Sequence, residues 1–340
     1  MLPKVGTLKL MVFSIMLLHI MQYLKRYYLN NNGKGPIDFN DFDIRITNKH
    51  DDRYLKFKKI YNVAAVLFEH RPLVELKFIL QHYHDVLPID VSLHVFHSIY
   101  NLDKLPKLNS YALHNNIKRN ITYTDTGFGN ISRSFYNNYM KSHKFWKDDL
   151  KDYDYVLLFQ TDTLICNEKK YENEKYIASL FQYDYIGAPW LDETKTWNPQ
   201  RLKLHPNRPQ GFPCACLQDR TIPKLYTTVG NGGLSWRNRN AMIQVIDRFK
   251  NNDKPFNEDL WFACGCLAMN LQLANESVAS KFAIESLKDG YKIKQTPFGL
   301  HKTWEYVDNL VERLGGSQNC KALETLMNIL KANNEAKQEL

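Results

Sequence analysis

Short, almost uninterrupted apolar runs alternate with amphipathic segments between residues 62 and 159, and this alternation constrains the fold more than any other feature. Strands of a parallel sheet have this composition, because helices cover both of their faces. The runs that predict strands are Asn62–Phe68, Val91–Phe96, Asn120–Tyr123 and Tyr155–Phe159. Helices are predicted after Pro72 and over Ser132–His143. The alternation predicts an α/β fold with a three-layer sheet.

Open α/β sheets bind ligands at the carboxyl ends of their strands. The first predicted strand is followed there by Glu69 and Arg71, and the fourth by Gln160, Thr161 and Asp162. A carboxylate in the position of Asp162 can hold a hard divalent cation, which in turn binds a diphosphate. The alternative is that Asp162 has a structural role and caps the next turn.

Beyond Asp162 the pattern is less regular. Tyr183–Trp190 precedes a stretch of about 35 residues rich in Pro, Asn and basic side chains, which is a candidate functional loop. The glycines of Gly230–Gly233 either let the backbone approach a ligand or form a structural turn. Helices are predicted near Arg239–Arg248 and from Asn257 onward.

Two further features are candidates for chemistry. Glu258 and Asp259 are adjacent carboxylates, of which one could serve as general base for a hydroxyl. The alternative is a charged first turn of a helix, where acidic residues suit the dipole. His301 could be a ligand supplied from far along the chain, or a packed or surface histidine.

The six cysteines leave three interpretations open. They are Cys166, Cys214, Cys216, Cys264, Cys266 and Cys320. The two Cys-x-Cys pairs suggest zinc, although the spacing differs from that of common structural sites. Two disulfides between the pairs would require an oxidising compartment. Plain buried thiols are the interpretation we favour.

The formal charge of +9 lies mostly in the N-terminal region. Residues 1–59 contain eleven Lys/Arg against five Asp/Glu, a balance of +6, which leaves +3 for residues 60–340. A nucleic-acid groove across the folded body is therefore disfavoured, and no nucleic-acid partner is predicted. We expect an apolar segment over 1–29, a polar linker over 30–59, a catalytic domain over 60–310 and a C-terminal helix over 311–340.

The apolar run at residues 8–24 is at the short limit for a bilayer span and contains Lys9 and His19. It could be an uncleaved anchor or membrane-associated helix, a packed amphipathic helix, or a cleaved signal. The location of the protein, membrane-associated or cytoplasmic, stays open. At the other end, the spacing of Leu323, Leu326, Met327 and Leu330 predicts an amphipathic helix packed on the domain.

Seven segments taken in order resemble the DUF5672 family, a domain family whose assignment as glycosyltransferases rests on analogy with nucleotide-sugar transferases of the GT-A fold. The resemblance runs from about Val63 to Trp304. The segments are Leu67–Pro72, Phe145-Trp146, Leu158–Thr163, Tyr183–Trp190, Val229–Ser235, Asn257–Asp259 and Gly299–Lys302.

The resemblance implies a GT-A-like α/β fold, a UDP- or GDP-sugar donor, and a glycan, protein or lipid acceptor. It implies Mn²⁺ or Mg²⁺ bound by Asp162 and His301, Asp259 as the base of an inverting transfer, and Glu258 as the residue that positions the acceptor. The donor-binding residues that it implies are Glu69, Arg71, Gln160, Thr161, Asp162, Asn231, Gly232 and Gly233. Position 160 departs from the Asp-x-Asp pattern of the GT-A enzymes, so an inactive sugar-nucleotide or glycan-binding protein is the alternative.

Overall fold

The computed structural model describes residues 45–46, 55–56, 61–106, 120–129, 131–190, 212–217, 225–249, 256–286, 293–307 and 309–338. The chain divides into two units, Met1–Ile60 and Tyr61–Leu340. In the first unit, β1 (Arg45–Ile46) pairs antiparallel with β2 (Leu55–Lys56). The apolar run at residues 8–24 lies outside the described residues. Among the described helices, none has the length and apolar character that crossing a bilayer requires.

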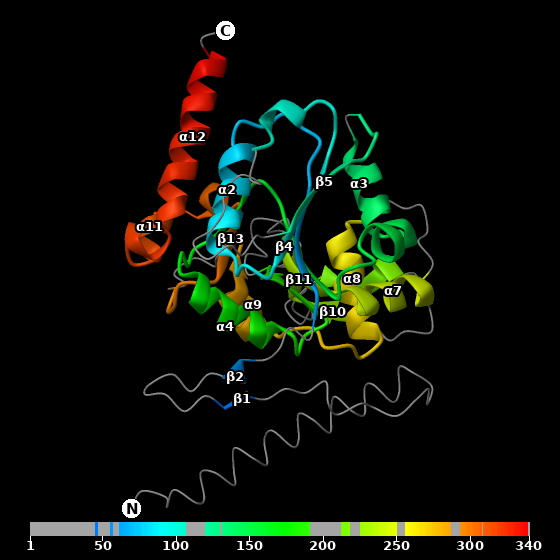
Figure 1. Cartoon of the computed structure of the whole chain (residues 1–340). Helices are drawn as coiled ribbons and strands as arrows, with labels where there is room; N and C mark the ends of the chain where they lie inside the picture. The colour runs from blue at the N-terminus through cyan, green and yellow to red at the C-terminus, as the bar shows by residue number, and fades with distance from the viewer. Residues whose placement is uncertain are drawn as a thin grey trace, which may run out of the picture. The chain divides into compact units, whose positions relative to one another are not determined.

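A mixed six-stranded sheet forms the centre of the second unit, in the order β5-β4-β3-β6-β11-β8 (Figure 1). Its first four strands are parallel to one another, and β11 runs antiparallel to both β6 and β8. The strands are β3 (Val63–Phe68), β4 (Ser92–His97), β5 (Ile121–Asp125), β6 (Tyr155–Phe159), β8 (Tyr185–Pro189) and β11 (Val229–Asn238). Every residue of β3 and β6 is buried, as their continuous apolar sequences predict.

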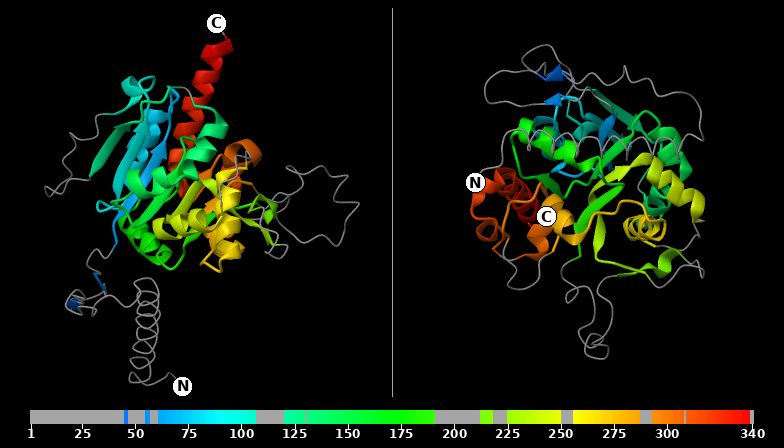
Figure 2. Two further views of the ribbon diagram at one scale, coloured as in Figure 1. Left: turned by 90° about the vertical axis from the view of Figure 1, so that its right-hand side faces the viewer. Right: turned by 90° about the horizontal axis from the view of Figure 1, so that it is seen from below.

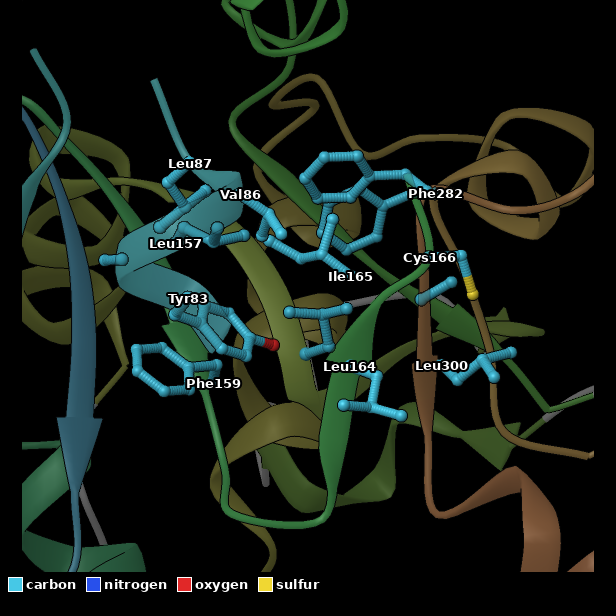
Figure 3. Close-up of a cluster of buried hydrophobic side chains, with 14 of the residues drawn as sticks. Tyr83, Val86, Leu87, Leu157, Phe159, Leu164, Ile165, Cys166, Phe282 and Leu300 are labelled. Atoms are coloured by element: carbon cyan, nitrogen blue, oxygen red, sulfur yellow. The ribbon is translucent and has the colours of Figure 1, made fainter. Parts of the chain in front are cut away.

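One face of this sheet packs against α2 (Leu76–Val86), α4 (Lys170–Leu180), α9 (Glu276–Phe282) and α12 (Lys321–Gln338). Tyr83 of α2 stacks on Phe159 with 3.8 Å between ring centroids, and both lie in the buried cluster of Figure 3. Leu323 and Leu326 bury the start of α12 in the same cluster, whereas Met327 is exposed. The C-terminal helix is therefore packed on the domain along its N-terminal half.

The opposite face packs against α3 (Arg133–Met140), the π-helical segment Lys144–Asp149, α7 (Arg239–Arg248) and α8 (Glu258–Ala268). The left view of Figure 2 shows α7 and α8 in front of the sheet. The side chains of β3 alternate between the two clusters, because successive residues of a strand point to opposite faces. This arrangement confirms the predicted α/β class with helices on both faces of a sheet.

A smaller sheet of β12 (Ala283–Ile284), β13 (Gly299–His301) and β7 (Thr163–Ile165) adjoins the large one. The chain passes from the large sheet into the small one through the turn between β6 and β7. The remaining short elements are β9 (Phe212–Pro213), the 3₁₀ turns Leu102–Lys104, Cys214–Leu217 and Ser317–Asn319, β10 (Tyr226–Thr227), α10 (Thr303–Tyr306) and α11 (Leu310–Arg313).

The preference for plain buried thiols is wrong for four of the six cysteines. Disulfides join Cys166 to Cys320 and Cys214 to Cys264, and Cys266 is a free buried thiol. The Cys214–Cys264 bond is one of the two bonds between the Cys-x-Cys pairs that the disulfide alternative predicted, and the free thiol of Cys266 contradicts the second. The Cys166–Cys320 bond, which fastens the start of α12 to the end of β7, was not predicted, because 154 residues separate its partners.

Candidate functional site

Asp162 lies in the turn where the chain leaves the large sheet. The Thr163 hydroxyl donates a hydrogen bond of 2.6 Å to the Gln160 carbonyl, and the Lys302 N–H donates one of 2.8 Å to the Asp162 carbonyl. These bonds hold the turn against the end of β13. The Oδ1 atom of Asp162 is buried and has no hydrogen-bond partner. Asp162 thus places an unpartnered carboxylate oxygen at the junction of the two sheets.

His301 closes β13 directly opposite this turn, because β13 pairs with β7 so that His301 faces Thr163. Its Nε2 atom lies 3.6 Å from Asp162 Oδ1. The imidazole is buried, and burial lowers its pKa, which the Asp162 carboxylate only partly offsets. The ring is therefore neutral at pH 7. Its Nδ1 atom also lacks a hydrogen-bond partner.

Glu285 follows β12 and faces the other side of the imidazole. Its Oε1 atom lies 3.5 Å from His301 Nδ1, and its Oε2 atom accepts a hydrogen bond of 2.7 Å from the Asn231 side-chain amide. Burial, and then the charges of Asp259 and Asp162, raise the pKa of Glu285 to about 7. Glu285 is a site residue that the sequence analysis missed.

The glycine-rich segment lies within a strand, β11, and does not form a turn. Its pairing with β8 shifts register on both sides of Asn231, which marks bulges. A Cβ atom on Gly233 would overlap the His301 ring, and one on Gly232 would lie 2.7 Å from the Cβ of Asp259. Only glycine lets the strand pass this close to both side chains.

Asp259 lies in the first turn of α8, beside the bulged strand. Its Oδ2 accepts a hydrogen bond of 3.2 Å from the Gly232 N–H, and its Oδ1 accepts one of 2.7 Å from the Leu260 N–H. Burial, followed by the neighbouring Glu258 carboxylate, raises the pKa of Asp259 to about 6. Asp259 is therefore mostly ionised at neutral pH and able to take a proton, which suits a general base.

Glu258 forms a buried ion pair with Arg237 of β11. Both of its oxygens are engaged, at 2.6 Å from Nη1 and 3.0 Å from Nη2, and the Arg237 Nε–H donates to the Ser235 hydroxyl. The Glu258 N–H donates in turn to the Asn137 side chain. This network fastens the N-terminus of α8, and with it Asp259, to the large sheet.

Glu69 and Arg71 lie at the carboxyl end of β3. Glu69 Oε1 accepts hydrogen bonds from the Arg71 N–H and Nε–H at 2.8 and 2.9 Å, and Oε2 accepts one of 2.7 Å from Nη2. The Arg71 side chain is 63% exposed, and its charge interacts with the Asp162 carboxylate. Arg71 therefore presents part of its guanidinium to solvent at the same edge of the sheet as Asp162.

The two other predicted donor-binding residues belong to the Asp162 turn. Gln160 is half-buried and hydrogen-bonds to Tyr136, and Thr161 is buried. Contacts and electrostatic interactions thus connect Arg71, Asp162, His301 and the β11 segment, and Gly232 links that segment to Asp259.

Among the described residues, the site does not contain a complete set of metal ligands. No group of three or more His, Cys, Asp or Glu side chains within the described part of the chain is arranged to hold a metal ion. Asp162 and His301 nevertheless fit as two ligands, because the buried Oδ1 of Asp162 has no hydrogen-bond partner and the neutral ring faces it. A carboxylate oxygen and an imidazole nitrogen suit Mn²⁺, and an ion held by this pair would need further oxygen ligands.

A model of the family described as "Protein of unknown function (DUF5672)" matches residues 119–301, more than half of the chain. The chain belongs to the DUF5672 family. The DUF5672 match ends at His301 and includes Asp162, Asn231, Asp259 and Glu285, whereas Glu69 and Arg71 lie outside it. No curated protein matches the chain.

Two residues of the site were missed from the sequence of this DUF5672 member. Glu285 directly follows the apolar residues Phe282–Ile284, which is the same signal that singled out Asp162 after β6. Arg237 occupies a strand, where its complete burial is explained only by Glu258, 21 positions further along the chain.

Proposed function

We propose that the chain is a glycosyltransferase that moves a sugar from a nucleoside-diphosphate sugar to an acceptor hydroxyl, with inversion at the anomeric carbon. The observation that carries the proposal is the Asp259 carboxylate. It faces the bulged strand, is held by the Gly232 N–H, and has a pKa of about 6. A six-stranded mixed sheet with helices on both faces is compatible with a GT-A-like fold.

The chemistry assigned to Asp259 is proton transfer. As the acceptor oxygen attacks the anomeric carbon, its proton passes to the Asp259 carboxylate, and the bond from the anomeric carbon to the diphosphate oxygen breaks. A base with a pKa near 6 is ionised at pH 7 and still basic enough to take the proton in the transition state. The glycines at 232 and 233 let β11 pass against Asp259 and His301, so that both side chains reach the site.

The other side of the site is suited to the leaving diphosphate. Asp162 and His301 would hold a divalent cation, which would neutralise the charge that develops on the diphosphate. The exposed part of the Arg71 guanidinium can contact a phosphate through its planar fork. Arg71 stays oriented for this contact because Glu69 binds it through both oxygens.

The contacts of Glu258 favour a different role from the predicted one. Because Arg237 engages both of its oxygens, we assign Glu258 to holding the N-terminus of α8, so that Asp259 is fixed against Gly232. Positioning of the acceptor by Glu258 stays a prediction.

The experiment that tests the proposal is a thermal-shift screen of UDP- and GDP-sugars, with and without Mn²⁺, followed by assays of transfer and of donor hydrolysis. A donor at about 100 times its dissociation constant adds about 2.7 kcal/mol to the free energy of unfolding, which is easily detected. Asp259→Asn should bind the donor and lose turnover, and Asp162→Asn should weaken donor binding. Full activity in both variants would refute the roles assigned to them.

A catalytically inactive sugar-nucleotide or glycan-binding protein is the second candidate. Gln160 occupies the turn that carries Asp162, so the turn supplies a single carboxylate. Donor affinity that is equal in the native chain and in Asp259→Asn, with no turnover on any acceptor, would favour this candidate.

A further inference from the structure

His301 is enclosed between two carboxylates, and its protons cannot satisfy both. Nε2 faces Asp162 Oδ1 at 3.6 Å, and Nδ1 faces Glu285 Oε1 at 3.5 Å. A neutral imidazole carries one ring proton, on one nitrogen or the other. One gap therefore holds the proton, and in the other gap a nitrogen lone pair faces a carboxylate oxygen.

Glu285 favours a ring proton facing it more strongly than Asp162 does. Oδ1 of Asp162 is buried, but the Asp162 side chain as a whole is 35% exposed against 16% for Glu285. Water therefore screens the Asp162 charge more than the Glu285 charge. Glu285 is also fixed in orientation, because Oε2 accepts from the Asn231 amide. A flip of the Asn231 amide would break both this bond and the hydrogen bond of 3.1 Å that its Oδ1 accepts from the Gly233 N–H.

We propose that Glu285 is the positioning residue of His301: its Oε1 keeps the ring proton on Nδ1, so that the Nε2 lone pair faces Asp162. A cation is then the group that best fits between Nε2 and Asp162 Oδ1. A carboxylate behind a ligand histidine orients the ring in this way at many metal sites. The claim that this cation belongs to a donor complex rests on the proposed function. The position of the ring proton does not depend on it.

Glu285→Gln tests the proposal because Asn231 dictates how the new amide is oriented. The glutamine oxygen would accept from Asn231 Nδ2, as Oε2 of Glu285 does, which turns the glutamine NH₂ group toward His301 Nδ1. A donor facing Nδ1 requires an unprotonated Nδ1. The ring proton should therefore move to Nε2, into the gap beside Asp162.

The readout is the tautomer of His301, measured on the full chain at pH 8 without metal by nitrogen-15 NMR of labelled histidine. The His301 signals are identified by their absence from His301→Gln. Glu305→Gln is the matched control, because Glu305 also acts on His301 electrostatically but is paired with Lys302 and does not face the ring nitrogens. Titration with Mn²⁺ alone then gives the metal affinity of each variant.

The native chain and Glu305→Gln should carry the proton on Nδ1, and Glu285→Gln should carry it on Nε2 and bind Mn²⁺ about 10–100-fold more weakly. A proton on Nε2 in the native chain would overturn the proposal, even if Glu285→Gln failed to fold. An unchanged tautomer in a folded Glu285→Gln would overturn it as well. The expected tautomers without Mn²⁺ binding by the native chain would support the role of Glu285 and count against metal-assisted transfer.

Discussion

Replacing Glu258 by glutamine should destabilise the fold severely, although glutamine has nearly the same size and shape and the change removes only the charge. Arg237 is fully buried, and Glu258 is its charged partner through both oxygens. Burial alone would lower the pKa of Arg237, but the Glu258 charge more than offsets this, so the pKa is raised. Glu258→Gln removes that offset, but an arginine side chain does not give up its proton in proteins. Arg237 therefore stays charged in the variant and loses the charge that compensates it.

Removal of one partner from a buried ion pair costs about 3–5 kcal/mol, because the remaining charge is left in a medium that solvates it poorly. The rings of Tyr185 and Phe262 lie 5.0 and 5.6 Å from the guanidinium and would recover a small part of this loss. A domain is typically stable by about 5–15 kcal/mol in all. Glu258→Gln should therefore remove about a fifth or more of the free energy of unfolding.

The assay is equilibrium unfolding in urea at pH 7, with Glu324→Gln on the exposed side of α12 as the control. The double variant Arg237→Gln/Glu258→Gln removes both charges. It should be less destabilised than the sum of the single variants by at least about 2 kcal/mol. A loss below about 1 kcal/mol in Glu258→Gln, or additive effects in the double variant, would refute the assignment of Glu258 as a structural partner of Arg237.

Four other outcomes are expected. Activity should rise with pH through about 6, as Asp259 ionises, and Asp259→Asn should lower kcat by about 10²–10⁴-fold; a flat pH profile would contradict this. Glu285 has a folded pKa of about 7 against an ordinary value of 4.5, so its stability contribution is present below pH 4.5 and lost as pH rises through 7. Urea unfolding should show a loss of roughly 3 kcal/mol between pH 4.5 and 8 that is missing in Glu285→Gln, and parallel curves would be evidence against it. Gly233→Ala should cost about 1–3 kcal/mol, since the new methyl group overlaps the His301 ring, and a thermally neutral variant would rule this contact out. Loss of the Cys166–Cys320 disulfide in a Cys166→Ser/Cys320→Ser variant should cost about 2–4 kcal/mol by calorimetry, and no change in the melting temperature would exclude a stabilising bond.

The four parallel strands of the large sheet could be predicted from the sequence, whereas β11 could not. The residues of β3 and β6 are apolar throughout, and short runs of this composition favour strands that helices cover on both faces. β11 contains three glycines within residues 229–238, which lowers its intrinsic preference for a strand. Its conformation is imposed by pairing with β6 on one side and β8 on the other, and these contacts have no local signal.

Most residues of the candidate site could be predicted from the sequence, whereas the contacts between them could not. Asp162 and His301 were selected separately, 139 positions apart, and the pairing of β13 with β7 brings them to 3.6 Å. Glu285 was missed because β12, the strand that places it, has only two residues and no periodic pattern. For Gln160, the departure from a carboxylate could be read from the sequence, whereas its contact with Tyr136 could not.

The charge of the assembled site explains why a cation would stabilise it. Asp162, Asp259 and Glu285 interact electrostatically, and the neutral His301 brings no positive charge to them. The neighbouring cations within the described segments are each paired with a carboxylate: Arg71 with Glu69, Arg237 with Glu258 and Lys302 with Glu305. The raised pKa values of Glu285 and Asp259 reflect the cost of burying these carboxylates first, and their mutual repulsion second. A neutral sugar alone would leave that cost unchanged, whereas a divalent cation would relieve it. Mn²⁺ alone should therefore raise the melting temperature of the native chain, and more at pH 8 than at pH 5.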